Sequence, residues 1–518
     1  MDDNITFPHF LDNLDQFLRL QELDDRICKA GKRLVVDIVK GNPRLNEDRK
    51  EALKNVSIAG SISEGATLAR LFSANKVFPD GCNREAEVDI EFVVTEVPLE
   101  HKVLVTDIIE KPGYLRLQTD TALLTLANNI GWNISEEDKA DIISKVCSTE
   151  GYVQPYKIKE YALSKVKYKD EKGATKIIIA AALGKKKKDV SFEADQSITK
   201  SSVGSDFLLR IDGQPFLNIS FDTVPLFRIP WWPSIAEEWK RRERKWPSDE
   251  VIDEITSVCY IIAKPSVEEK YNNETTELRY AFAHVERELV LMRSPHQNLV
   301  YLIFKVLIYK WIKPIDSDHL SSFLAKSIML WTCESHPPDH QLWHQSSTLD
   351  ALSYLLQQLL EAFQKGELPY FFINHINVIE AVPENIRRAV CDKISQMLSN
   401  LTMYLPTSMD TELKAAHEIL HMINETCDIL REIKRKDYSR LLRQPELIGD
   451  VLSYFIRDMD LKDLLKKGEE ELKRVERKVR EEAKRSETKV REEVKRSEQK
   501  IRSEAKRVET KLRKKFKL

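Results

Sequence analysis

Several classes of protein are excluded by what this sequence lacks. Its 7 cysteines are dispersed, with no Cys-x-x-Cys pair and no Cys/His cluster of zinc-finger spacing, which favours reduced thiols over disulfides or a zinc-bound fold. The chain begins without the basic and apolar segments of a signal peptide, so we expect a cytoplasmic protein. The longest apolar run, residues 298–312, contains Lys305 and Lys310 and is too short to span a bilayer.

An overall excess of one charge is also absent. Lys and Arg total 81 and Asp and Glu total 83, for a formal net charge of -2, so the whole chain favours no particular charged partner. Residues 474–517 differ, because they hold 19 Lys or Arg against 9 Glu. Hydrophobic residues make up 42% of the 518 residues, which is enough to build cores in roughly two to four domains.

The spacing of apolar residues predicts a mixed first half. Residues 13–40 have helical spacing and predict one long helix, with a break near Gly31 as an alternative. Five strand-like runs follow, at residues 55–60, 87–94, 176–183, 206–211 and 217–227. We therefore expect a sheet packed against helices up to about residue 250.

The second half reads as helical. From residue 250 onward, apolar residues follow a helical pattern that we extend over 257–263 and 277–292. The Pro- and charge-rich run at 240–250 predicts a hinge between two lobes. The predicted domains are an α+β core at 1–250, an all-helical lobe at 251–465 and a charged helix at 466–518.

The last segment is an internal repeat of four eleven-residue units, from Arg474 to Lys517. Eleven residues in three helical turns keep a stripe of apolar or small residues on one side of a nearly straight helix. The stripe is thin and favours a solvated single helix or a weak coiled coil. The alternative is a basic amphipathic arm that self-associates, binds nucleic acid or lies on an anionic membrane surface.

Three acids share one face of a predicted strand. Glu87, Asp89 and Glu91 alternate with apolar residues, and like charges so close together repel unless solvent or a cation screens them. Asp222 has the same alternation in a later predicted strand. Convergence of Glu87, Asp89 and Asp222 would create a site for two Mg²⁺ or Mn²⁺ ions. The alternative is an ordinary solvated face.

A Gly-Ser turn precedes these acids. Gly60 follows the run VSIA, and a glycine at a turn lets the backbone approach a ligand closely. Ser61 stands at the expected start of a helix, where free N–H groups attract an anion. Ser61-x-x-Glu64 also has the spacing of a capping box. The two interpretations are compatible, because a capped helix start is also a phosphate site.

Gly-Ser, an acid-x-acid strand and a third acid on a later strand resemble the nucleotidyltransferase pattern of polymerase beta and oligoadenylate synthase. The stretches ISFDTVPLFRIPWWPSIAEEW, LRYAFAHVERELV and LSSFLAKSIMLWTCE resemble the male-abnormal-21 family, which includes cyclic GMP-AMP synthase and the animal cGAS-like receptors. The resemblance covers residues 50–400. It implies a bilobal, polymerase-beta-like fold with a mixed sheet core and a helical C-terminal lobe.

The resemblance also implies roles for individual residues. Gly60 and Ser61 would hold a triphosphate, and Glu87, Asp89 and Asp222 would be the catalytic metal ligands. Further nucleotide contacts would come from Arg279, Glu286, Lys305, Ser322 and Phe323. Phe323 stands where the family has a tyrosine, so it keeps a stacking face and lacks the hydroxyl.

These nucleotide contacts have structural alternatives. In the alternative without a ligand, Arg279 is a surface charge on a helix, and the Lys305 ammonium reaches solvent from an apolar helix. Ser322 would be an N-cap with Phe323 in the core, and Glu286 has the weakest link to a ligand.

The chain departs from the family's pattern in ways that bear on its ligands. Leu278, Ala281 and Ala283 replace a tryptophan and two serines, which leaves the identity of the nucleobases open because a missing polar group alters discrimination. The short stretch VLMRSPHQNL contains no cysteine where the DNA-sensing synthase has its zinc thumb. We therefore expect no structural zinc, and we favour double-stranded RNA over DNA as the activating partner.

A duplex binder needs a basic surface, because phosphate contacts dominate affinity and A-form RNA is recognised by shape. The long first helix carries Arg19, Arg26, Lys29, Lys32 and Arg33, next to Asp24 and Asp25. The other candidates are Lys185, Lys186, Lys187 and Lys188, and Lys240, Arg241 and Arg242. Solvated charge runs are the alternative for each group.

The leading hypothesis is a metal-dependent nucleotidyltransferase that makes a cyclic dinucleotide from ATP, GTP or other nucleoside triphosphates. The resemblance implies activation by double-stranded RNA in innate immune sensing, with a STING-type receptor for the product. The alternative is a catalytically inactive member of the same family that acts as a binding or scaffold protein. Retention of all three acids beside Gly-Ser favours the enzyme, because carboxylates that repel one another need a cation.

Overall fold

A computed structural model describes most of the chain up to residue 447. The described residues are 6–41, 56–61, 65–72, 85–119, 144–165, 174–198, 203–269, 271–435, 437–442, 447, 499 and 503. Met1–Ile448 forms one compact unit and Gly449–Leu518 a second. The eleven-residue repeat lies outside the described residues apart from Gln499 and Ser503, so its stripe stays a prediction, as do the proposed domain boundaries. Among the described helices, none is long and apolar enough to cross a membrane.

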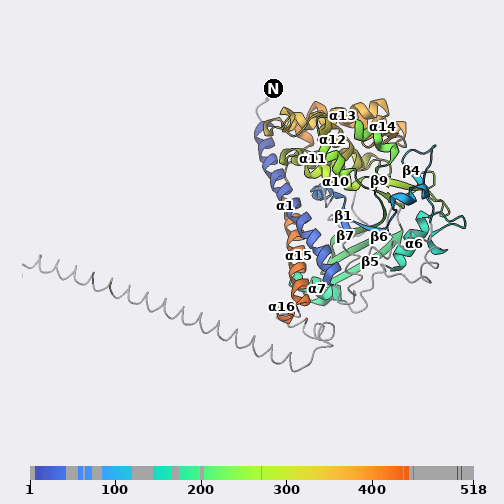
Figure 1. Cartoon of the computed structure of the whole chain (residues 1–518). Helices are drawn as coiled ribbons and strands as arrows, with labels where there is room; N and C mark the ends of the chain where they lie inside the picture. Colours follow the sequence, from blue (N-terminus) through green and yellow to red (C-terminus); the bar gives the residue numbers. More distant parts are fainter. Residues whose placement is uncertain are drawn as a thin grey trace, which may run out of the picture. The chain divides into compact units, whose positions relative to one another are not determined.

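The first helix, α1 (Thr6–Gly41), is continuous over 36 residues. The predicted long helix is thus present, and the alternative break at Gly31 is wrong. Its buried face repeats every three or four residues, through Phe17, Leu20 and Leu23. Helix α15 (Asp410–Lys434) packs along α1, and both run beside the strands and the helical lobe (Figure 1).

The sheet has nine strands and is mixed. Its main order is β1-β2-β7-β8-β9-β4-β3, with β6 pairing to β7 and β5 to β6. Strands β2 and β7 are parallel, whereas the other pairs in this sheet are antiparallel. The bounds are β1 Val56–Ala59, β2 Glu85–Glu96, β3 Val105–Asp107, β4 Tyr114–Leu117, β5 Val190–Ile198, β6 Val203–Ile211, β7 Gln214–Ile229, β8 Cys259–Ile262 and β9 Leu278–Ala281. The predicted mixed α/β content is confirmed.

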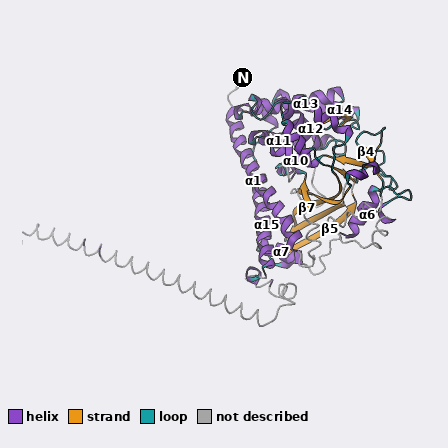
Figure 2. Cartoon of the chain, viewed as in Figure 1, coloured by secondary structure: helices purple, strands orange, loops and turns teal. Residues whose placement is uncertain are grey.

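Helices occupy most of the second half, and Figure 2 shows α10–α14 gathered beside the strands. The remaining α-helices are α6 Pro155–Lys165, α7 Ala174–Ala182, α8 Glu237–Arg241, α9 Asp249–Ile255, α10 Ala283–Leu291, α11 Pro295–Leu307, α12 Phe323–Ser335, α13 Thr348–Lys365, α14 Glu384–Ser399 and α16 Ser439–Leu442. Shorter elements include the 3₁₀ turns η2 Leu68–Phe72 and η3 Leu99–Leu104, a π-helical turn at Ile308–Ile312, and the hairpin of β10 Pro369–Tyr370 and β11 Ile373–Asn377.

Three predicted runs have the wrong secondary structure, and the lobe predicted at 251–465 is not all-helical because it contains β8, β9, β10 and β11. Residues 176–183 were expected as a strand, but three alanines, the strongest helix formers, follow the isoleucines and α7 forms instead. Residues 257–263 and the start of 277–292 were expected as helix, but β8 and β9 occupy them. Three of the four residues of β8 are buried, and a strand buried on both faces shows no alternation of apolar and polar residues.

An aromatic cluster joins α8 to the β10–β11 hairpin. Trp239 is fully buried, and its ring centroid lies 5.6 Å from that of Trp232 and 4.9 Å from that of Phe372. Phe282 stacks on Phe372 at 4.8 Å. The cluster holds the end of β9 against the hairpin, beside the residues predicted to contact a nucleotide.

We expect Trp239→Ala to lower the free energy of unfolding by about 3–5 kcal/mol, because it removes a large side chain from a filled core. Urea denaturation followed by circular dichroism measures this. Leu291→Ala is the matched control, since Leu291 is 66% exposed and its loss changes stability by about 0.5 kcal/mol or less. Equal effects of the two substitutions would contradict the assignment of this core.

Candidate active site

The register of β2 and β7 brings two of the predicted acids together. Asp89 and Asp222 are directly paired residues on these parallel strands, so their side chains emerge on the same face of the sheet. Both side chains are half-buried. Glu87 pairs with Ser220 two residues earlier on the same strands, which is the register position that shares this face. The side chain of Glu87 lies outside the described part of the structure.

Gly60 lies close to the carboxylate of Asp89. Ala59, the last residue of β1, pairs with Asp89, and Gly60 follows with φ of +68°. A Cβ atom at Gly60 would overlap the Asp89 carboxylate Oδ2. Glycine is therefore required here for two reasons, a left-handed backbone and the close approach of the Asp89 carboxylate.

Ser61 is engaged by Lys305 of α11. The Lys305 ammonium donates to Ser61 Oγ at 2.8 Å and to the Ala66 carbonyl at 3.1 Å. Lys305 is only 2% exposed, so the alternative in which it reaches solvent is wrong. A buried cation beside the Gly-Ser turn is suited to an anionic ligand. Residues 62–64 lie outside the described residues, so the capping box with Glu64 stays a prediction.

A third acid of the same face is buried. Glu91 accepts a hydrogen bond from Ser57 Oγ at 3.1 Å, and burial raises the pKa of its carboxyl. Arg287 and Glu286 of α10 lie within electrostatic range of Glu91, and α10 packs on β1. The acidic face therefore adjoins the helix that carries one of the predicted nucleotide contacts.

The remaining predicted contacts form a second group. Glu286 is buried and pairs with Lys326 at 2.9 Å. The Lys326 ammonium lies 5.8 Å from the Phe323 ring centroid, and the ring of Tyr370 lies 5.9 Å from that of Phe323. Burial raises the pKa of Tyr370 far above its usual value, and Glu286, Arg279 and Lys326 all act on it electrostatically. These residues gather around Tyr370.

The structural roles considered as alternatives to nucleotide binding for Arg279, Ser322 and Phe323 are only partly supported. Arg279 lies in β9 and not on a helix, and Phe323 is half-buried, so it is not a core residue. Ser322 occupies the N-cap position of α12, but its side chain makes no capping hydrogen bond. Sequence reasoning missed Lys326 and Tyr370. Lys326 follows Phe323 by one helical turn, which was the available signal for its position.

The acids of this site fit a hard divalent cation. Asp89 and Asp222 place two carboxylates on one face of neighbouring strands, and like charges this close repel unless a cation is shared. Oxygen ligands suit Mg²⁺ and Mn²⁺. Within the described residues, no group of three or more His, Cys, Asp or Glu side chains forms a ready-made metal site. A complete site would need a further ligand from the substrate or from Glu87.

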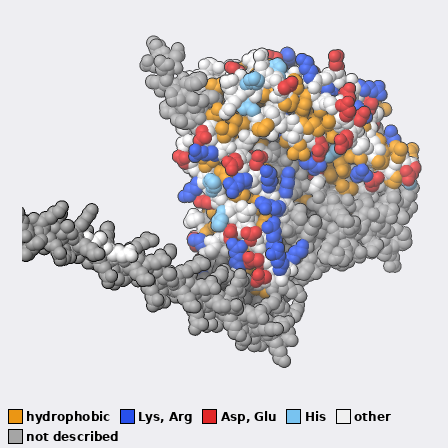
Figure 3. Space-filling model, turned by 60° about the vertical axis from the view of Figure 1, so that its left-hand side comes forward, with side chains coloured by type: hydrophobic (Ala, Val, Ile, Leu, Met, Phe, Trp, Pro, Cys, Tyr) orange, Lys and Arg blue, Asp and Glu red, His pale blue; other side chains and the backbone are white. Residues whose placement is uncertain are grey.

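The basic groups differ in how available they are. Lys185 pairs with Asp212 at 2.8 Å, Lys240 with Asp253 at 3.0 Å and Arg241 with Glu237 at 3.1 Å. Lys186 and Lys188 are exposed and Lys187 is half-exposed. On the face to which α1 and α15 contribute, Lys and Arg side chains form a column (Figure 3), and Arg19, Arg26, Lys29 and Arg33 of α1 are exposed.

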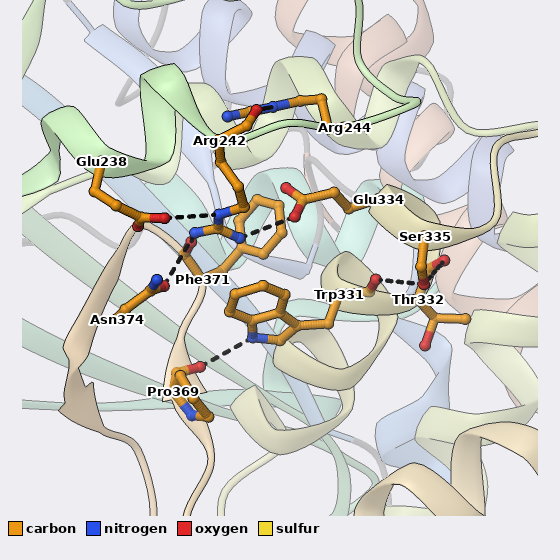
Figure 4. A network of polar contacts seen from close by, with 10 residues as sticks. All are labelled: Glu238, Arg242, Arg244, Trp331, Thr332, Glu334, Ser335, Pro369, Phe371 and Asn374. Atoms are coloured by element: carbon orange, nitrogen blue, oxygen red, sulfur yellow. Dashed lines mark hydrogen bonds and ion pairs between the residues drawn. The ribbon is translucent and has the colours of Figure 1, made fainter.

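Arg242 is held inside the protein. Its guanidinium pairs with Glu334 at 2.9 Å and donates to the Phe371 carbonyl at 2.9 Å. It also lies 4.3 Å from the Trp331 ring centroid (Figure 4). Burial raises the pKa of Glu334, and Arg242 opposes that rise. Because these partners occupy Arg242, any duplex contact in the 240–242 run would depend on Lys240 and Arg241.

Comparisons with known proteins identify the family of this chain. The Mab-21 protein nucleotidyltransferase domain matches residues 86–292, and the Mab-21 protein HhH/H2TH-like domain matches residues 300–396. Together the two domains span more than half of the chain. Strand β7, strand β2 from Ala86 onward and the residues gathered around Tyr370 lie within these matched ranges. The chain belongs to the Mab-21 family. Gly60, Ser61, α1 and α15 lie outside both matched ranges.

Individual relatives are distant. A cyclic GMP-AMP synthase-like receptor of Magallana gigas is 26% identical over 35% of this chain and 31% of its own length. Another from Ctenocephalides felis is 25% identical over 23% of this chain and 27% of its own. A protein mab-21-like of Drosophila melanogaster is 21% identical over 29% of this chain and 41% of its own. The chain thus matches less than half the length of each.

We expect Gly60→Ala to destabilise the protein by about 2 kcal/mol or more, because it adds backbone strain and displaces Asp89. Gly213→Ala is the matched control. Gly213 has φ of +77° and would meet no atom within 4 Å, so its substitution costs only the strain, about 1 kcal/mol. Thermal or urea unfolding compares the two variants. Equal losses of stability in the two variants would show that the close approach of Gly60 to the Asp89 carboxylate has no effect on stability.

We expect Arg242→Met to lower the free energy of unfolding by about 3–5 kcal/mol, because it leaves Glu334 buried without its cation. Arg241→Met is the control in the adjacent position, where the side chain is 78% exposed, and it should change stability by about 0.5 kcal/mol or less. Arg242→Met combined with Glu334→Leu should recover part of the loss. If the double variant is as unstable as Arg242→Met alone, the unpaired carboxylate of Glu334 is not the cause of the lost stability.

Proposed function

We propose that this protein is a metal-dependent nucleotidyltransferase that joins two nucleoside triphosphates into a cyclic dinucleotide. In each of two steps, a ribose hydroxyl attacks an α-phosphorus, a new phosphodiester bond forms and pyrophosphate leaves with the departing electron pair. The proton of the hydroxyl passes to solvent or a carboxylate. The observation that carries this proposal is the direct pairing of Asp89 with Asp222 beside Gly60.

Each group would have a distinct role. Asp89 and Asp222, together with Glu87, would hold Mg²⁺ or Mn²⁺, which neutralises charge on the attacking and leaving oxygens. Ser61 and Lys305 would bind the triphosphate. Their mutual hydrogen bond of 2.8 Å places a hydroxyl and an ammonium together on the side of the Gly-Ser turn, where phosphate oxygens accept hydrogen bonds from both.

The second group would bind a nucleobase. Phe323 and Tyr370 offer aromatic faces, and stacking on such faces accepts any base. Arg279 and the Glu286–Lys326 pair offer charged donors and an acceptor. Glu286 is already satisfied by Lys326, so contact with a base would require this pair to rearrange or to act through Lys326. The choice of ATP, GTP or another nucleotide would follow from that contact.

The activator would be double-stranded RNA. The column of Lys and Arg on the α1 and α15 face supports a duplex site on that side (Figure 3), since phosphate contacts provide most of the affinity for a duplex. The relatives named cyclic GMP-AMP synthase-like receptors support a synthase that responds to a ligand, and we extend this to a trigger by nucleic acid in innate immunity. The product would act on a STING-type receptor, and the synthase would work in the cytoplasm.

A second candidate is a binding or scaffold protein without turnover. Membership of the Mab-21 family is compatible with this alternative, because a fold does not by itself determine an activity. The acids argue against it, because adjacent carboxylates without a cation destabilise a sheet.

We expect purified protein with ribonucleoside triphosphates, Mg²⁺ or Mn²⁺ and long double-stranded RNA to form a cyclic dinucleotide detectable by mass spectrometry. Asp89→Asn and Asp222→Asn should each lower the rate by about a hundredfold or more, since each removes a metal ligand worth several kcal/mol in the transition state. Glu254→Gln, at an exposed acid of α9, should keep the wild-type rate. Absence of product with RNA, DNA or no duplex would favour the scaffold.

A further inference from the structure

Asp24 is an acid on the buried face of α1. It is 0% exposed, and its neighbours on that face are apolar, among them Leu20, Leu23 and Ile27. Burial raises the pKa of its carboxyl to about 7. An acid in such a place costs stability unless its hydrogen bonds compensate, and apolar residues of similar volume often stabilise as well or better. Packing of α1 alone therefore gives no reason for an acid here.

The hydrogen bonds of Asp24 go to the segment that follows the Gly-Ser turn. Its Oδ1 accepts from the backbone N–H of Thr67 at 3.2 Å and of Leu68 at 3.3 Å. These amides begin η2, so Asp24 caps this turn from another element. The Cys28 thiol also lies 3.8 Å from Oδ1. Its other oxygen, Oδ2, has no hydrogen-bond partner among the described residues.

The same segment is held at its other end by Lys305. The ammonium bonds the Ala66 carbonyl and the Ser61 hydroxyl, and the Ala66 N–H donates to the Ser61 carbonyl at 3.2 Å. Asp24 and Lys305 thus bind the same peptide group, Asp24 at the Thr67 N–H and Lys305 at the Ala66 carbonyl. Lys305 also acts electrostatically on Asp24. Any shift of the Thr67 and Leu68 amides would move the carbonyl that orients the Lys305 ammonium.

Helix α15 fixes the helix that carries Asp24. It packs along α1 and against η2, the Gln16 side chain accepts from the Met409 N–H at 2.8 Å, and the Cys427 thiol lies 3.9 Å from the Ala30 carbonyl. Helix α15, which lies outside both matched family domains, thus holds α1 against the segment after Ser61.

We propose that Asp24 is a positioning residue for triphosphate binding, which acts through the Thr67 and Leu68 amides to place the Ser61 hydroxyl and the Lys305 ammonium. This inference rests on the proposed function, since it assigns a triphosphate to Ser61 and Lys305. It adds that the placement of α1, held by α15, determines how well the phosphates are bound. Asp24 itself touches no substrate.

The test compares variants that separate stability from binding. Asp24→Leu keeps the branched shape of the side chain and removes both acceptors, whereas Asp24→Asn keeps Oδ1 as an acceptor. Leu20→Ala, one helical turn earlier, creates a cavity in the same buried face and leaves the Asp24 carboxylate in place. Each variant is studied as the full chain with duplex RNA. The Kd of a non-hydrolysable ATP analogue with Mg²⁺ is measured by calorimetry, and stability by urea denaturation.

We expect Asp24→Leu to raise the Kd of the analogue roughly tenfold, as loss of a capping interaction of about 1–1.5 kcal/mol predicts. Asp24→Asn should stay within about twofold of the wild type, and Leu20→Ala should lose stability while keeping the wild-type Kd. Asp24→Leu and Lys305→Met should also be non-additive, because both act on the same segment.

Three outcomes would overturn the inference. Wild-type affinity in a folded Asp24→Leu variant would do so, as would an equal loss of affinity in Leu20→Ala at matched stability. If Asp24→Leu does not fold, a tenfold loss of affinity in folded Asp24→Asn would exclude the acceptor role. These results differ from failure of the proposed function, in which the wild-type protein itself binds no analogue and forms no product.

Discussion

Parallel pairing of β2 with β7 is the constraint on which the site depends. It sets Asp89 directly beside Asp222, and a slip of one residue would send one of the two acids to the other face of the sheet. The antiparallel pairing of β1 with β2 then brings Gly60 against the Asp89 carboxylate. These two registers thus determine the distance between the Gly-Ser turn and the acids.

The helical lobe contributes buried positive charge to the site. Lys305 of α11 donates a hydrogen bond to Ser61 in the Gly-Ser turn. Lys326 pairs with Glu286 beside the rings of Phe323 and Tyr370. Both lysines are anchored by acceptors in the protein, so their positions are set before any ligand arrives. A site with carboxylates on one side and ammonium groups on the other is suited to a metal-bound polyphosphate.

Much of this site could be predicted from the sequence, because alternation along a strand places Glu87, Asp89 and Glu91 on one face whatever their partner strand. The parallel partner itself, the contact between Lys305 and Ser61, and the burial of Asp24 depend on tertiary packing and have no local signal. Residues 176–183 and 257–263 were wrongly assigned for the same reason, since short apolar runs fit a buried helix and a buried strand equally well. Arg242 looked like a solvated charge, although Glu334 and Trp331, about ninety residues later, enclose it.

Binding of Mn²⁺ in the presence of a non-hydrolysable nucleoside triphosphate tests the central claim most directly. Electron paramagnetic resonance of the wild-type protein should show triphosphate-dependent Mn²⁺ binding that Asp89→Asn and Asp222→Asn each weaken strongly. Unchanged Mn²⁺ binding in both variants, with the triphosphate still bound, would contradict a shared cation between β2 and β7.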